Sequence, residues 1–123
     1  AVRLTHTGPV DWTYYTAERL EQAREERKTV VMVFTAEWCL NCKVLEKSIL
    51  TNPKVIDLLG DEQVLPMKVD ITGNNPEGKA KLKEVGSLTI PLLIVLDGDG
   101  NQVYKSDYYT ANQLLKAVRK SLK

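Results

Sequence analysis

The most constraining feature of this sequence is the run from Val30 to Phe34, which is short, continuously apolar and rich in β-branched valine. Such a run suits a strand that other layers cover on both faces. Two cysteines, Cys39 and Cys42, follow it immediately. From Leu40 to about Leu50 the apolar positions then recur at helical spacing, at Val44, Leu45 and Ile49. The sequence therefore predicts a buried central strand that leads into a cysteine pair at the start of a helix.

Capping signals predict four further helices. Their boundary residues are Thr16 to about Arg27, Asn52-Pro53 to Gly60, Asn75-Pro76 to Gly86, and Thr110, whose capping box with Gln113 opens the last helix. Apolar spacing predicts the buried residues of the first and last of these helices: Ala17, Leu20 and Ala23, and then Leu114, Leu115, Val118 and Leu122.

Further strands are predicted at Gln63–Val69, at Leu92–Leu96 after Pro91, and at Gln102–Lys105. The last two flank Asp97–Asn101, whose glycines tolerate the positive φ angles of a tight hairpin. Strands that alternate with helices and end in a hairpin and a helix predict an α/β fold, a three-layer sandwich around a central sheet. With 123 residues and a hydrophobic fraction of 43%, we expect one domain at 10–123 after a flexible lead-in at 1–9.

Composition excludes several function classes. Seventeen basic and sixteen acidic side chains leave a net charge of +1, so no global field favours nucleic acid or an anionic membrane. The basic cluster Lys79, Lys81 and Lys83 lacks interleaved aromatic residues and is interpreted as a solvated helix face. No apolar stretch approaches the roughly 20 residues of a membrane-spanning helix. The start Ala1-Val2-Arg3-Leu4 lacks the pattern of a secretory signal. This absence is compatible with an excised domain, a mature secreted chain or a cytoplasmic protein.

The position of the cysteines predicts redox chemistry. Cys39 is expected at the amino-terminal edge of a helix, where free N–H groups and the helix dipole favour a thiolate. Cys42 lies almost one helical turn further on, where it can resolve a mixed disulfide. Three alternatives are weaker: a zinc site, for which the chain offers only the two cysteines and the distant His6; a purely structural disulfide, whose loop is very small; and two ordinary buried thiols. No metal and no separate cofactor is expected.

At these residues the chain resembles the thioredoxin superfamily, whose members place Trp-Cys-x-x-Cys after a central strand; here the motif is Trp38 to Cys42. Ile90-Pro91 resembles the cis-proline of that family, which lies beside the reactive pair and helps to hold extended substrate backbone. The resemblance therefore implies a thioredoxin fold with a mixed sheet, and substrate-binding roles for Trp38, Ile90 and Pro91. Trp38 could instead simply cover the edge of the core, and Pro91 could be a trans proline at a strand edge.

Within the superfamily the chain looks most like the C-terminal domain of DsbD, over about Thr16 to Leu122. The matching segments are Thr35–Lys43 with Glu46, Asn52–Val55 and Asp97–Gly100. This resemblance implies a protein-disulfide reductase that is a periplasmic, soluble domain of a membrane protein, in electron transfer that includes cytochrome c biogenesis. Its partners would be thiol-disulfide proteins or other domains of the same protein, and we expect a monomer.

Two other functions remain open. The second hypothesis is a free-standing general thioredoxin-like reductase, which could be cytoplasmic. It ranks below the first because Leu40-Asn41 replaces the Gly-Pro of general thioredoxins. A non-catalytic binding module on a thioredoxin fold is the third.

One departure from the family concerns acidic groups. Thioredoxins and DsbD domains usually place a buried Asp six residues before the first cysteine, where this chain has Val33. Glu46 lies four residues after Cys42, on the same helical side, and matches an acidic position of DsbD domains. We therefore expect Glu46, and alternatively Glu37, to modulate the thiols. Glu46 could instead be a solvated residue paired with Lys43 or Lys47.

Overall fold

The computed structural model describes residues 10, 12–49, 51–73, 75–87 and 89–122, so the predicted lead-in at 1–9 lies outside the described residues. Within the described residues, strands and helices alternate along the chain. Their order is β1 (Thr13–Tyr14), α1 (Ala17–Glu25), β2 (Thr29–Thr35), α2 (Leu40–Ile49), α3 (Pro53–Leu59), β3 (Val64–Asp70), α4 (Pro76–Glu84), β4 (Leu92–Leu96), β5 (Gln102–Ser106) and α5 (Ala111–Ser121).

The strands form one mixed five-stranded sheet in the order β1-β3-β2-β4-β5. β2 lies at its centre, parallel to β3 and antiparallel to β4, with Met32 opposite Met67 on one side and Ile94 on the other. β5 continues the sheet antiparallel to β4, and β1 pairs in parallel with β3. β1 was not predicted from the sequence, because two residues are too few to show a strand periodicity.

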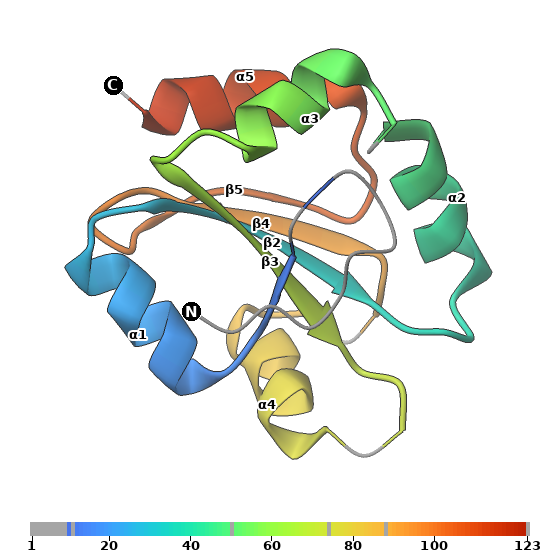
Figure 1. Ribbon diagram of the computed structural model, residues 1–123. Helices are drawn as coiled ribbons and strands as arrows, with labels where there is room; N and C mark the ends of the chain where they lie inside the picture. Colours follow the sequence, from blue (N-terminus) through green and yellow to red (C-terminus); the bar gives the residue numbers. More distant parts are fainter. Residues whose placement is uncertain (1–9, 11, 50, 74, 88, 123) are drawn as a thin grey trace.

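Alternate side chains of β2 enter two separate cores, and all seven residues of the strand are buried. Val31 and Val33 pack in the core beneath α2, α3 and α5, whereas Val30, Met32 and Phe34 pack in the core beside α1 and α4. Figure 1 shows α3 and α5 on one side of the sheet, α1 and α4 on the other, and α2 beyond the end of β2. The predicted three-layer α/β sandwich is therefore confirmed.

Local capping sets most helix boundaries. Thr16, Asn52 and Asn75 accept hydrogen bonds from the first turns of α1, α3 and α4, and Thr110 and Gln113 form the predicted reciprocal capping box of α5. Gly86, just beyond α4, has a φ of 84° and marks its predicted end.

Two details of the predicted helices were wrong. α1 ends at Glu25, and Arg27 takes a left-handed φ of 57° in the turn to β2 instead of closing the helix. Ala17 is exposed, because the amino end of α1 projects beyond the core. Of the three apolar positions at helical spacing in α2, Leu45 and Ile49 enter the core, whereas Val44 is exposed.

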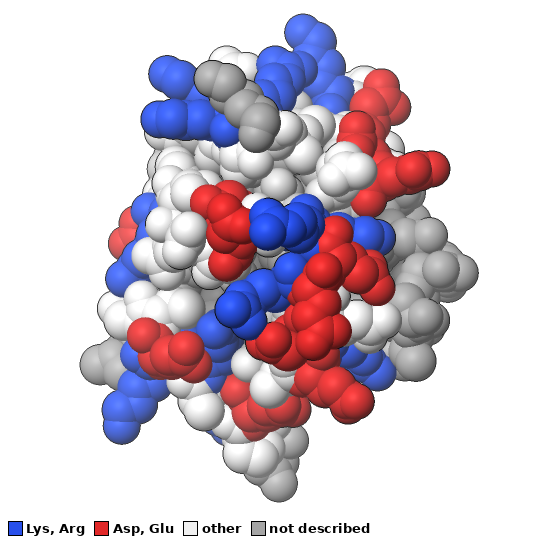
Figure 2. Space-filling model, turned by 90° about the vertical axis from the view of Figure 1, so that its left-hand side faces the viewer, with Lys and Arg blue, Asp and Glu red and all other residues white. Residues whose placement is uncertain are grey.

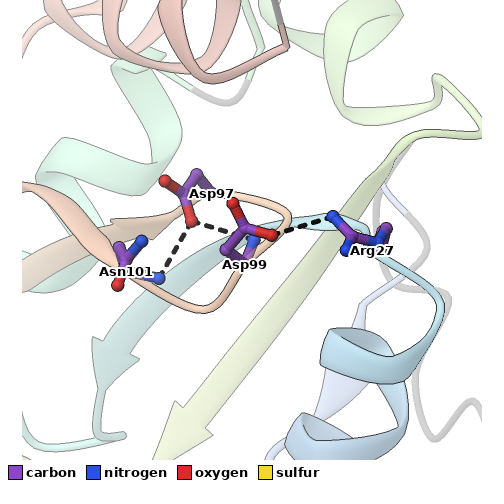
Figure 3. Close-up of polar contacts among 4 residues, drawn as sticks. All are labelled: Arg27, Asp97, Asp99 and Asn101. Atoms are coloured by element: carbon purple, nitrogen blue, oxygen red, sulfur yellow. Dashed lines mark hydrogen bonds and ion pairs between the residues drawn. The ribbon is translucent and has the colours of Figure 1, made fainter.

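The β4–β5 hairpin is organised by Asp97 (Figure 3). Its Oδ1 accepts hydrogen bonds from the backbone N–H of Asp99 (3.0 Å) and of Asn101 (2.9 Å). Asp99 points the other way and forms an exposed ion pair of 2.8 Å with Arg27. Of the two hairpin glycines, both able to tolerate a positive φ, Gly100 has one, at 87°. Gly98 has a different role, since a Cβ there would lie 2.9 Å from the carbonyl oxygen of Arg27.

We predict that Asp97→Ala lowers the free energy of unfolding by about 1 kcal/mol, because two backbone N–H groups lose their acceptor. The matched control is Asp99→Ala, which removes only an exposed ion pair and should cost roughly 0–1 kcal/mol, at the low end of that range. Urea unfolding of the oxidised proteins measures both. An effect of Asp99→Ala equal to that of Asp97→Ala would contradict this account of the hairpin.

Candidate functional site

The two cysteines lie where β2 gives way to α2. Cys39 directly precedes the helix, and its carbonyl oxygen accepts the N–H of Lys43 at 3.3 Å. Its Sγ accepts the N–H of Cys42 at 3.2 Å, in the manner of a helix-capping side chain. The two residues are joined by a disulfide, with their Cα atoms 5.3 Å apart. The helix terminus therefore holds the first sulfur against a free backbone donor.

This arrangement makes the two sulfurs unequal. Cys39 is 7% exposed and Cys42 is 0% exposed, so an incoming sulfur can reach only the first. On reduction, the helix dipole and the Cys42 N–H favour a thiolate at Cys39. Cys42 Sγ lies 3.9 Å from the carbonyl oxygen of Phe34, which can accept the proton of a buried Cys42 thiol. The two cysteines therefore differ in exposure and in hydrogen-bond partners.

An exposed apolar rim adjoins the disulfide. Trp38 is 65% exposed, Leu40 76% and Val44 61%, although each is large and apolar. Only Trp38 was assigned a role from the sequence. The spacing of Leu40 and Val44, four residues apart on one helix, is the signal that locates them on one face. Trp38 does not cover the core edge, as its exposure shows. We call these three residues the apolar rim.

The loop after β3 supports the loop that carries Trp38. The N–H of Ile71 donates to the carbonyl oxygen of Thr35 at 2.9 Å, and the N–H of Glu37 donates to Oγ1 of Thr72 at 2.7 Å. The side chain of Glu37 is exposed. These bonds hold the strand end in place while leaving the Glu37 carboxylate in solvent.

The Ile90–Pro91 bond is cis, as expected from the sequence. Ile90 packs against the core cluster that contains Cys39 and Cys42. Ile90 therefore lies on the side of the sheet where the cysteines are, and Pro91 directly precedes β4. Its part in substrate binding stays a prediction.

Glu46 is half-buried, and its Oε2 is buried without a hydrogen-bond partner. Among the described residues, no ion pair joins it to Lys43 or Lys47, the partners considered for a surface position. Val33 is fully buried in the apolar core. Of the acidic residues considered, Glu46 is thus the one placed beneath the surface.

Tyr109 was missed by the sequence analysis. It is fully buried, and its hydroxyl has no hydrogen-bond partner. Burial, and then the Glu46 carboxylate, raise the pKa of Tyr109 far above its ordinary value. The sequence does contain a signal for the burial of Tyr109, because Tyr109 immediately precedes the capping residue Thr110. An apolar residue at that position packs against the fourth helical residue in a hydrophobic staple, and that residue, Leu114, lies in the same core cluster.

The surface away from this site carries both signs of charge. Figure 2 shows the side of the molecule opposite α2, where basic and acidic side chains lie next to one another. Arg24 pairs with Glu21 at 2.9 Å, and Lys81 with Glu84 at 3.3 Å. Over the part of the chain that the structure describes, no group of three or more His, Cys, Asp or Glu side chains is arranged to hold a metal ion. The helices of that part include none that is long and apolar enough to cross a bilayer.

The chain is similar in sequence to known thioredoxin-like proteins. A family model described as thioredoxin-like matches residues 11–98. The thiol:disulfide interchange protein DsbD of Salmonella typhi is 34% identical over 89 residues, which are 71% of this chain and 15% of that protein. DsbD of Campylobacter jejuni is 27% identical over 110 residues, 86% of this chain and 19% of that protein. The chain therefore spans less than a fifth of the length of these curated relatives.

Solved structures agree on the fold. The oxidised C-terminal domain of Neisseria meningitidis DsbD superimposes with a TM-score of 0.67 at 28% identity, over 85% of this chain and 90% of that one. A thioredoxin from Thermus thermophilus, at 22% identity, gives a TM-score of 0.72 over 92% of this chain and 87% of that one. With its strand order, its cysteine pair at the start of α2 and a family model that covers residues 11–98, the chain belongs to the thioredoxin-like family.

Proposed function

We propose that this chain is a thiol-disulfide oxidoreductase domain that passes two electrons between protein partners through Cys39 and Cys42. The observation that carries the proposal is the inequality of the two cysteines: Cys39 caps a helix and is still 7% exposed, whereas Cys42, one turn later, is 0% exposed. A purely structural disulfide needs no such asymmetry.

The exchange proceeds in two displacements. In the reducing direction, the Cys39 thiolate attacks one sulfur of a partner disulfide; that S–S bond breaks, the partner's other sulfur leaves as a thiolate, and a mixed disulfide forms. The Cys42 thiolate then attacks Cys39 Sγ and displaces the partner's remaining sulfur. The Cys39–Cys42 disulfide forms, the partner gains two electrons, and its two thiolates take up protons. The domain needs no other cofactor for these steps.

The cellular role that we propose is that of the reductase domain in a DsbD-like electron relay. Two observations support it: relatives named DsbD match most of this chain, and a DsbD C-terminal domain matches nearly end to end. We accordingly place the domain outside the cytoplasm, as a monomeric part of a membrane protein that serves thiol-disulfide partners, cytochrome c biogenesis included. The apolar rim, with Ile90 and Pro91, would contact the partner around Cys39.

The decisive experiment is reduction of insulin by dithiothreitol, followed by turbidity. The wild-type domain should accelerate precipitation, and the Cys39→Ala/Cys42→Ala double variant should match the rate of dithiothreitol alone. A non-catalytic binding module would leave the rate unchanged in both cases. A general reductase and a relay domain separate in a second assay, because a relay domain should reduce insulin slowly but exchange rapidly with the other domains of a DsbD protein.

The two cysteines should behave differently when replaced singly. We predict that Cys42→Ala accumulates a mixed disulfide with partners through Cys39, because no resolving sulfur remains. Cys39→Ala should lose reductase activity. In the reduced wild type, iodoacetamide should alkylate Cys39 first, as peptide mapping by mass spectrometry would show. Faster labelling of Cys42 would contradict the assignment of roles.

Glu46 should oppose ionisation of the thiols. A negative charge beside the pair raises the free energy of a thiolate, so Glu46→Gln should lower the pKa of Cys39, with any effect on Cys42 of the same sign. Glu37→Gln is the matched control, since that carboxylate is exposed and solvent screens it, and its effect should be smaller. The measurement is thiolate absorbance against pH. Superimposable curves for wild type and Glu46→Gln would show that Glu46 has no influence on the thiols.

A further inference from the structure

Two buried oxygen atoms in this domain have no hydrogen-bond partner, Oε2 of Glu46 and the hydroxyl oxygen of Tyr109. They are the side-chain atoms of this kind within the described residues. Native structures pair nearly all buried polar groups, since burying one without a partner costs the full free energy of its desolvation. One of these atoms is on α2 and the other is in the loop that leads into α5.

The two residues are connected through one core cluster. Tyr109 belongs to the core cluster that includes Leu45 and Ile49, which flank Glu46 on α2. Glu46 is in turn one helical turn beyond Cys42. Burial and the Glu46 carboxylate both raise the pKa of Tyr109, so the phenol keeps its proton and is available as a donor.

No other charged group of the described residues competes with Glu46 at Tyr109. The charged side chains on the elements around it are exposed: Lys43 and Lys47 on α2, Lys54 and Asp57 on α3, Asp107 before Tyr108, and Lys116 on α5. Lys68 of β3 lies over the ring of Trp12, 5.0 Å from its centroid. Val33, on the central strand of the same cluster, offers no polar atom. Of the charged groups on these elements, Glu46 is therefore the half-buried one that acts on Tyr109.

We propose that Tyr109 is a positioning residue for thiol exchange: its hydroxyl donates a hydrogen bond to one bridging water, which donates in turn to the buried oxygen of Glu46 and holds that carboxylate on the helix face of Cys42. The proposal rests on the exchange chemistry proposed above, because the thiols report the charge on Glu46. Without the hydroxyl, the carboxyl group turns to solvent or takes up a proton. Either response weakens the negative charge that opposes thiolate formation.

The test is a double-mutant cycle on the reduced domain, read as thiolate absorbance against pH. Tyr109→Phe keeps the ring and removes only the hydroxyl. It should move the Cys39 titration to lower pH, in the same direction as Glu46→Gln, and the double variant should titrate like Glu46→Gln alone. Tyr108→Phe, at the exposed neighbouring position, should superimpose on wild type. A Tyr109→Phe curve that matches wild type, or a shift that persists in full in the Glu46→Gln background, would overturn the proposal.

A second measurement does not depend on the folding of Tyr109→Phe. In the NMR spectrum of the otherwise intact protein, the Tyr109 hydroxyl proton should move upfield in Glu46→Gln, because an amide oxygen accepts more weakly than a carboxylate. An unchanged resonance would count against the bond. Failure of the proposed function is separate: the wild type would then not accelerate insulin reduction, while the same titrations would still decide the role of Tyr109.

Discussion

The burial of β2 on both faces is the constraint on which the rest of this structure depends. Its seven residues are all buried, and their alternation divides the interior into two cores, one beneath α2, α3 and α5 and one beside α1 and α4. Neighbouring strands on both sides satisfy its backbone, so the strand can be apolar throughout. Because Cys39 follows this fixed strand after a short loop, the amino end of α2 is held near the carboxyl end of β2. The packing of the core thereby sets the position of the reactive sulfur.

The sequence could predict whatever is decided locally. The central strand, the capping residues Asn52 and Asn75 and the reciprocal bonds of Thr110 and Gln113 depend on near neighbours, and the structure has them. Features set by distant contacts were missed. Gly98 is required by the approach of Arg27, about 70 residues away, and not by its own φ. β1 exists because β3 offers an edge to pair with, which a two-residue pattern does not reveal.

The same distinction runs through the candidate site. The cysteines and the cis-proline were recognisable as motifs, because their chemistry requires those residue types. The exposure of Val44 could not be recognised in this way, because Val44 and Leu45 fit helical spacing equally well. Only the packing of α2 against the sheet decides which of the two faces the core. Under the proposed function, the exposure of the apolar rim has a reason: a surface that contacts partners transiently must remain uncovered when they leave.

Val33 and Glu46 illustrate how a core and a redox site share one helix and one strand. A carboxylate on β2 would place a charge inside the cluster that holds the sheet to α2, α3 and α5, and burying it would cost several kcal/mol without a partner. Valine at this position keeps that interior apolar. A carboxylate on α2 can instead keep one oxygen near solvent while the other enters the core, which matches the half-buried state of Glu46. The buried oxygen still needs a donor, and under the inference drawn above the Tyr109 hydroxyl, just before α5, serves it without adding a charge.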